Sequence, residues 1–274
     1  MKLTTLTLIL TLGILPQVQS QTVQEMRKKV TECFEAADYK CAEKYLKKLI
    51  KKDHTSSKLS TYYSDLGTSQ RRLGKKAEAL EAYNKAIDKN PKVPIYYTNR
   101  ATLKEQLGDI PGALKDYASA QKIDPTFDKV YLNRSSLYEK QGSIDKAMAD
   151  LQTLLNYDPD NFKAGSNLAI LKKRKGDIKG ALEDYDKLIE KNPTEANLYN
   201  NRADTRMKLN MLEEALEDAE KAIQLDNQYA IAYVTKGEVL LALNQVEEAC
   251  KFFNQAIELG LNPNIIQSLM ENCK

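Results

Sequence analysis

The feature that most limits how this chain can fold is a pattern of residues that repeats every 34 positions, clearest in residues 60–93. Within that unit, one helical pattern runs to about Leu73 and a second from about Lys76 to Lys89. Gly74 stands between them, where a left-handed residue lets the chain turn, and Pro91 stands where the second helix must stop. The unit therefore predicts two helices joined by a tight turn.

The same spacing recurs in five further units without an insertion. The turn place is always Gly or Asn, and Asn is the next best residue after Gly for a left-handed conformation. Place 20 of the unit is always Ala, as close packing of two helices requires. The turn residues are Gly74, Gly108, Gly142, Gly176, Asn210 and Asn244, and the alanines are Ala79, Ala113, Ala147, Ala181, Ala215 and Ala249. This regularity predicts an array of stacked helix pairs.

The two ends of the array depart from the pattern. Residues 21–59 fit a degenerate N-terminal unit with a looser joint near residues 53–57, and Ala37 takes its turn place. The regular units that follow are 60–93, 94–127, 128–161, 162–195, 196–229 and 230–263. Residues 264–274 predict a short helix that caps the open end, as solenoids usually require. Its apolar stripe consists of Ile265, Ile266, Leu269, Met270 and Cys273.

Residues 1–20 are similar to a secretory signal peptide. One basic residue precedes an apolar run over residues 3–15, we expect Pro16 to break the helix, and Val18 and Ser20 are small residues at a cleavage site. The alternative is an uncleaved anchor, although the run is shorter than the roughly 20 residues that span a bilayer. We expect an exported chain, periplasmic or extracellular, with no stable membrane insertion after cleavage.

Four cysteines form two local pairs near the ends of the array. Cys33 and Cys41 flank the turn of the first unit. Eight residues of one helix would separate them by about 12 Å, which is too far for a disulfide, but a fold back at the turn brings them into range. Cys250 lies in the last regular unit and Cys273 in the capping helix. Export favours a disulfide within each pair, and four buried free thiols are the alternative.

The repeated places resemble those of the tetratricopeptide repeat (TPR): aromatic at 4 and 24, small at 8, Gly at 15, Ala at 20 and 27, and Pro at 32. With Ser60 as place 1, these are Tyr63, Tyr83, Gly67, Gly74, Ala79, Ala86 and Pro91. Later units depart in part, since Gly165 replaces an aromatic residue and Asn227 a proline. The resemblance covers residues 60–263. It implies an all-α, right-handed α-solenoid of about seven TPR units plus a C-terminal capping helix.

By the same resemblance, places 2, 5, 6, 9, 12 and 13 face a concave groove that binds a partner segment. Place 6 holds four asparagines, whose amides can pair with the backbone of an extended peptide, and basic residues lie around them. The predicted peptide-binding residues are Asn99, Asn133, Asn167, Asn201, Arg71, Lys163 and Arg174. The alternative is that Asn only accompanies the Arg that follows it, as in many TPRs.

The search for chemistry finds no phosphate-binding loop, nucleophile elbow or zinc-protease motif, and the only histidine is His54. We therefore expect no catalytic residue, metal or cofactor. Lys and Arg number 41 against 38 Asp and Glu, which argues against a nucleic-acid binder. No small-molecule substrate is expected. The sequence favours a non-enzymatic scaffold or adaptor that binds a protein segment in its groove. The alternatives are an accessory subunit of an envelope or secreted enzyme complex, held by its convex face or ends, and a stand-alone enzyme.

Overall fold

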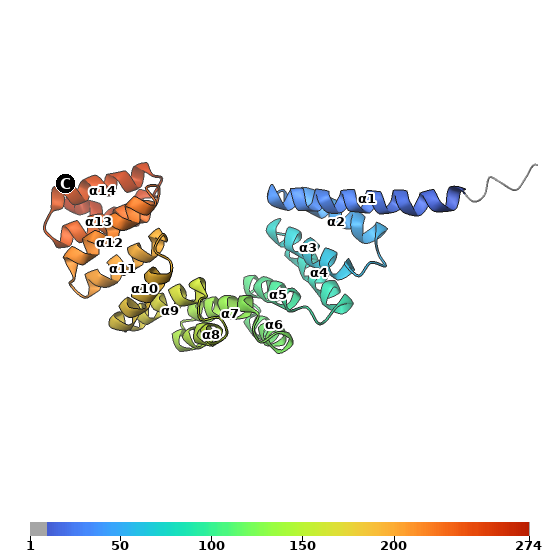
Figure 1. The fold of residues 1–274 in the computed structure, drawn as a ribbon, viewed down its shortest axis with the longest axis horizontal. Coiled ribbons are helices and arrows are strands. Elements are labelled where there is room, and N and C mark those ends of the chain that lie inside the picture. The colour runs from blue at the N-terminus through green and yellow to red at the C-terminus, as the bar shows by residue number, and fades with distance from the viewer. Residues whose placement is uncertain (1–9, 274) are drawn as a thin grey trace, which may run out of the picture. The chain divides into compact units, whose positions relative to one another are not determined.

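The computed structural model describes residues 10–273, with side chains from residue 22 onward, so part of the expected signal peptide lies outside the described residues. The described residues form fifteen α-helices and two short 3-10 helices, with no β-strand (Figure 1). They fall into two compact units, one ending at Arg134 and one beginning at Ser135. No described helix has the length and apolarity needed to cross a bilayer.

The N-terminal unit is a stack of antiparallel helix pairs in which each helix packs against the next one in the chain (Figure 1). Its helices are α1 (Leu10–Glu35), α2 (Tyr39–Lys52), α3 (Leu59–Arg72), α4 (Lys76–Lys89), α5 (Pro94–Gln106) and α6 (Ile110–Ile123). The next helix in the chain is α7 (Asp128–Lys140), which crosses from residue 134 to residue 135. The predicted helix bounds for residues 60–93 therefore hold to within one residue.

The C-terminal unit continues the same arrangement of successive pairs. Its helices are α8 (Ile144–Tyr157), α9 (Phe162–Lys175), α10 (Ile178–Lys191), α11 (Ala196–Lys208), α12 (Leu212–Leu225), α13 (Ala230–Ala242) and α14 (Val246–Glu258). Three short elements follow: η1 (Pro263–Ile266), α15 (Gln267–Met270) and η2 (Glu271–Cys273). The fold is thus the all-α, helix-pair architecture that the repeat predicts.

The turns within the pairs have the predicted left-handed backbone. The φ angle is +76° at Gly74, +59° at Asn210 and +51° at Ala37. Beyond such a turn, a backbone N–H reaches back to the end of the first helix, as from Lys75 to the Gln70 carbonyl at 2.9 Å. This bond satisfies a carbonyl that the helix end would leave unpaired. Each turn therefore ends one helix and sets the direction of the next.

The two helices of a pair approach closely because small residues face large ones. The alanines at place 20, such as Ala79 and Ala147, are fully buried. A Cβ added to Gly67 would lie 2.7 Å from the Tyr83 ring, and one added to Gly237 would lie 2.4 Å from the Phe253 ring. Place 8 therefore has to be small wherever an aromatic ring occupies place 24.

A tyrosine at place 4 ties most regular repeats to the end of the preceding one. Its hydroxyl donates to the backbone carbonyl six residues earlier, from Tyr97 to Pro91 at 3.2 Å and from Tyr199 to Pro193 at 3.1 Å. Repeat 162–195 has Gly165 here. A Cβ at Gly165 would lie 2.9 Å from a methyl of Leu188, so Leu188 occupies space next to the missing ring.

The arginine that follows the place-6 asparagine serves the fold. Arg100 donates two hydrogen bonds to Asp116, at 2.9 and 2.7 Å, and Arg202 donates two to Asp218, at 2.8 and 2.7 Å. Asp116 and Asp218 are buried on the second helix of their own repeats. Each buried carboxylate is therefore paired and hydrogen-bonded, which is the condition under which a protein tolerates one.

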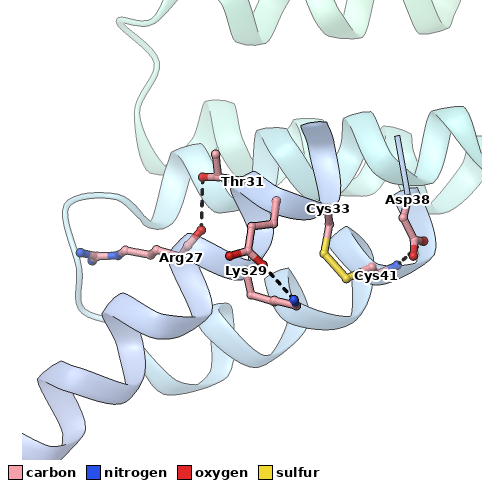
Figure 2. Close-up of a disulfide and its surroundings, with 7 residues drawn as sticks. Arg27, Lys29, Thr31, Cys33, Asp38 and Cys41 are labelled. Carbon is pink, nitrogen blue, oxygen red and sulfur yellow. Dashed lines mark hydrogen bonds and ion pairs between the residues drawn. A yellow bond between two sulfur atoms is a disulfide. The ribbon is translucent and has the colours of Figure 1, made fainter. Parts of the chain in front are cut away.

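At the N-terminal end, α1 and α2 are joined by a bond between Cys33 and Cys41, with Cα atoms 5.7 Å apart (Figure 2). Asp38 caps α2 by accepting from the Cys41 N–H at 2.9 Å. The expected break at Pro16 is wrong, because α1 is continuous from Leu10 to Glu35. A proline removes one backbone hydrogen bond and can kink a helix without ending it.

The joint between the degenerate N-terminal repeat (residues 21–59) and the regular repeats is held by three side chains from different segments. Arg27 on α1 pairs with Asp53 at 2.8 Å and donates to the Tyr62 hydroxyl at 2.5 Å. Tyr62 on α3 donates to the same carboxylate of Asp53 at 2.8 Å. These bonds lower the pKa of Asp53, although its partial burial acts in the opposite direction. Asp53, which lies in the joint, is therefore bonded both to α1 and to α3.

At the C-terminal end, Cys250 on α14 is bonded to Cys273, again with Cα atoms 5.7 Å apart. Ile266 is buried against α14, but Ile265 is 66% exposed, so its assignment to the apolar stripe is wrong. The reason is that residues 263–266 form a 3-10 helix. Its three residues per turn rotate neighbouring side chains farther apart than an α-helix does.

Candidate functional site

Within each unit, the first helices of neighbouring repeats lie side by side. In the N-terminal unit α3 contacts α5, and in the C-terminal unit α11 contacts both α9 and α13. We call the layer formed by these helices the first-helix face. It is the surface on which the resemblance places the groove residues, so it is the surface that has to be tested for a site.

Place 5 does not face a partner, which corrects the sequence-based expectation. Its residues are buried between neighbouring first helices, as for Ser64, Thr98 and Asn200. Asn99 donates to the Ser64 hydroxyl at 3.3 Å, so part of the asparagine series links one repeat to the next. Helices with such small polar residues at their contact can pack closely, and that packing covers place 5.

The C-terminal unit has a hollow of about 240 Å³ on this face, between α7 and α9. Its lining residues are Ser135, Ser136, Glu139, Leu151, Asn167, Ile170 and Leu171. Leu151 and Leu171 are buried and form an apolar floor, whereas Ser136 and Asn167 are exposed. The hollow therefore combines an apolar floor with polar groups at its edge. Pockets of this composition bind an apolar group and orient it by hydrogen bonds.

The hollow exists because place 24 of repeat 128–161 is Leu151. In repeat 60–93 this place is Tyr83, whose buried ring lies against the first helix and whose hydroxyl lies 3.2 Å from the Thr68 hydroxyl. Ser136 takes the place of Thr68 in repeat 128–161. Without a ring at place 24, the space beneath Ser136 is left open.

Charged groups on this face are paired with one another across neighbouring first helices. Arg174 on α9 forms an ion pair with Glu139 on α7, and Lys173 forms one with Asp204 on α11. Glu238 on α13 has a raised pKa, because burial disfavours its charge and the nearby Asp204 repels it, although Lys208 acts in the opposite direction. The charge of Arg174, one of the predicted peptide-binding residues, is thus partly neutralised.

The predicted peptide-binding residues do not form one cluster. Asn167 lines the hollow, and Arg174 adjoins it through Glu139. Asn99 and Asn133 belong to the N-terminal unit, and both are half-buried. In the remaining set, Asn201 is half-buried on α11, Lys163 is exposed at the start of α9, and Arg71 is half-buried at the end of α3.

Sequence reasoning missed most of the lining of the hollow, namely Ser135, Ser136, Ile170 and the floor leucines. A signal for it was available. Among the residues at place 24, Leu151 breaks a series otherwise made of Tyr83, Tyr117, Tyr185 and Phe253, apart from Ala219. A smaller residue at a ring position predicts unfilled space beside it.

Comparisons with known proteins agree with this architecture. Tetratricopeptide repeat profiles match residues 64–126, 128–161, 184–217 and 230–260, which together are more than half of the chain. The chain therefore belongs to the tetratricopeptide repeat family. No curated protein sequence matches it.

Among solved structures, a tetratricopeptide repeat protein from Parabacteroides merdae ATCC 43184 is 28% identical, covers 92% of this chain and 98% of its own, and has a TM-score of 0.67. YrrB, described as a TPR protein with an unusual peptide-binding site, is 22% identical over 66% of this chain and 93% of its own, with a TM-score of 0.51. PilW, a type IV pilus biogenesis factor, is 18% identical over 72% of this chain and 91% of its own, with a TM-score of 0.60.

The last two likenesses show the fold alone. Taken with the family, the fold defines the class of protein: a scaffold for protein–protein interaction, of a kind that is generally not enzymatic.

Proposed function

We propose that this protein is an exported, non-enzymatic scaffold that binds a segment of a partner protein on its first-helix face. The observation that carries the proposal is the hollow between α7 and α9, where the predicted residue Asn167 stands at the edge of an apolar floor. That YrrB is described as having a peptide-binding site supports a peptide as the kind of ligand for this fold.

The size and chemistry of the hollow favour a side chain of a partner over a free small molecule. At about 240 Å³ it is smaller than the roughly 300–1,000 Å³ of pockets for drug-sized ligands. Leu151, Ile170 and Leu171 offer apolar contact to one aliphatic side chain. The Asn167 amide, which can donate and accept, would then pair with the backbone of the same segment.

The charges around the hollow bear on which segments bind. Because Glu139 already pairs with Arg174, and Lys173 with Asp204, the face presents few unpaired charges for a ligand to meet. A charged ligand would have to compete with these existing pairs. We therefore propose that the bound segment places an aliphatic side chain in the hollow and that its backbone supplies the polar contacts through hydrogen bonds.

The proposal is tested by affinity measurements on a partner segment recovered by pull-down from the exported fraction. Asn167→Ala should weaken binding about 2- to 10-fold, the value of one hydrogen bond at about 0.5–1.5 kcal/mol. Asn133→Ala should weaken it similarly only if the segment reaches the N-terminal unit. The matched controls are Glu183→Ala and Lys187→Ala, exposed on the second helix of the same repeat. If the variant that combines Asn133→Ala with Asn167→Ala is folded by circular dichroism and binds as tightly as the parent, groove binding is refuted.

Export is a separate part of the proposal, with its own test. It is supported by the apolar N-terminal run and by the two cysteine pairs, both of which lie within bonding distance. N-terminal sequencing of the exported protein should begin at Gln21. Non-reducing peptide mapping should recover the Cys33–Cys41 and Cys250–Cys273 links and no others. Four free thiols in protein from outside the cytoplasm would contradict it.

A further inference from the structure

The balance of positive and negative charge over the whole chain conceals a strong segregation. Residues 1–134 contain 24 Lys and Arg against 15 Asp and Glu, a balance of +9, whereas residues 135–274 contain 17 against 23, a balance of −6. The negative charge is concentrated in the last part of the chain, because residues 135–211 contain 13 Lys and Arg against 12 Asp and Glu, whereas residues 212–274 contain 4 against 11. Charge segregated on this scale governs association more than it governs folding.

The positive charge is most concentrated on α2, which carries six lysines and a single acidic residue. All six lysines are exposed: Lys40, Lys44, Lys47, Lys48, Lys51 and Lys52. Their spacing places them on one side of the helix, opposite the buried Ala42, Leu46 and Leu49. We call this surface the lysine stripe.

The lysine stripe is largely uncompensated within the described residues. Only Lys47 among the six lies within ion-pair distance of a carboxylate, at 2.7 Å from Glu43 and 4.0 Å from Glu78. Lys44 and Lys48 instead lie over the Tyr45 ring, at 5.9 and 5.3 Å from its centre. These contacts hold the two ammonium groups near a half-buried aromatic ring, and they leave the positive charge available to a partner.

The C-terminal unit carries the opposite stripe at the same places of the repeat. With residue 23 as place 1 of the degenerate N-terminal repeat, places 18, 22 and 25 are Lys40, Lys44 and Lys47. The same places of repeat 196–229 are Glu213, Glu217 and Glu220 on α12. All three glutamates are exposed. Glu213 and Glu217 have no cation within ion-pair distance among the described residues, whereas Glu220 pairs with Lys236 at 2.9 Å. We call them the glutamate stripe.

We propose that the lysine stripe of one copy of this chain docks on the glutamate stripe of a second copy. The two stripes share a spacing of four and then three residues along an α-helix, about 10 Å in all at 1.5 Å per residue. Two such helices laid against each other can bring opposite charges together along that length. The two surfaces are different from each other, so the contact is heterologous and gives a closed ring or an open chain of copies.

The second copy is the occupant that the molecule itself points to, because its charge and spacing match those of the lysine stripe. Such an interface gains specificity and association rate from charge, and it weakens as salt screens it. The docking is independent of the hollow on the first-helix face, since α2 and α12 are both second helices of their repeats. Self-association and binding of a partner segment can therefore be tested separately.

The test is sedimentation velocity of the full chain as exported, across sodium chloride concentrations. Mass above the monomer should be present at 50 mM salt, and the dissociation constant should rise on the order of tenfold by 500 mM. Lys44→Glu with Lys48→Glu, and separately Glu213→Lys with Glu217→Lys, should each give monomers. A mixture of the two charge-reversed variants should associate again, because the first keeps the parental glutamate stripe and the second keeps the parental lysine stripe.

The control is Lys115→Glu with Lys122→Glu, which makes the same change of charge at exposed positions on α6 and should leave association as in the parent. A parent that is monomeric at every salt concentration would overturn the proposal. So would two reversed variants that fail to associate when mixed although circular dichroism shows both folded. If the parent stays monomeric but binds phosphatidylglycerol vesicles or polyglutamate through the lysine stripe, the occupant is an anionic surface or an acidic protein and not a second copy.

Discussion

Repeats 162–195 and 196–229 are neighbours in the C-terminal unit, yet they are held together differently. In repeat 196–229, Arg202 ties the buried Asp218 to the first helix and also reaches Asp186, while Arg206 binds Asp218 at 2.7 Å. Repeat 162–195 has Leu168 in place of that arginine, and its Asp184 is paired with Lys172 at 2.6 Å. Asp218 is 4% exposed and Asp184 is 20% exposed.

The difference shows where the repeat pattern is free to vary. Repeat 162–195 lacks the place-4 tyrosine and the place-7 arginine, and it is also the repeat that supplies Asn167, Ile170 and Leu171 to the hollow. Its paired aspartate is more exposed, so fewer buried bonds constrain its first helix. The tightly bonded repeat maintains the array, and the less tightly bonded one contributes to the candidate binding site.

The largest expected effect comes from removing the buried arginine. Arg202→Ala should lower the free energy of unfolding by about 3–5 kcal/mol, because it leaves a desolvated carboxylate with part of its hydrogen bonding lost. Lys172→Ala should cost about 1 kcal/mol or less, since its pair with Asp184 is partly solvated. Urea unfolding followed by circular dichroism compares the two. Equal losses would show that the two repeats are bonded equally well.

A smaller effect is expected from restoring the missing ring in repeat 162–195. Gly165→Tyr alone should destabilise by about 1–3 kcal/mol, because its Cβ would press on Leu188. Combining it with Leu188→Ala returns both places to the TPR pattern and should recover most of that loss. Midpoints of thermal unfolding for the single and double variants decide this. If the double variant is no more stable than Gly165→Tyr alone, the side chain at position 188 does not determine whether a ring fits at position 165.

The comparison extends to place 6, where the first regular repeat has Asp65, the next four have asparagine and the last has Thr235. Burial raises the pKa of Asp65 to about 6 from an ordinary value of 3.8. Because the folded form holds its proton more tightly, the contribution of Asp65 to stability falls as pH rises from about 4 to 6. Asp65→Asn should therefore be more stable than the parent by about 1–2 kcal/mol at pH 7, with allowance for partial solvation.

The pH dependence provides the control for that prediction. Well below pH 3.8 the Asp65 carboxyl is protonated in both the folded and the unfolded state, so most of the advantage of Asp65→Asn should disappear. Paired urea titrations of parent and variant at about pH 3 and at pH 7 measure the difference directly. An advantage of the same size at both pH values would attribute it to something other than the buried charge.

The fold followed from the sequence because its signals are local and repeated. The left-handed residues at 74, 210 and 37 mark turns wherever they occur, and the alanines at place 20 can only face another helix. Place 5 was assigned wrongly because the packing of first helices against each other is not encoded by the period. Ile265 was assigned wrongly because a 3-10 helix and an α-helix share the same short sequence signals.

The candidate site was predictable only in part. Asn167 was found through the resemblance, but the hollow beside it depends on Leu151, a residue 16 positions away on another helix. The pairing of Arg100 with Asp116 spans the same 16 positions, and it shows that the arginine after the asparagine is structural. The first pair joins helices of neighbouring repeats and the second joins the two helices of one repeat, and neither helical periodicity nor motif spacing reports them.

The central claim, that the first-helix face at the hollow holds a partner segment, is tested most directly by site-specific photo-crosslinking in the producing cell. A benzophenone amino acid would be placed at exposed Ser136, beside the hollow, and in a matched variant at exposed Lys187 on the second helix of repeat 162–195. We predict a discrete cross-linked product from position 136 that is absent from position 187 and is diminished by Asn167→Ala. A product from position 187 alone, or equal products from both positions, would contradict the account.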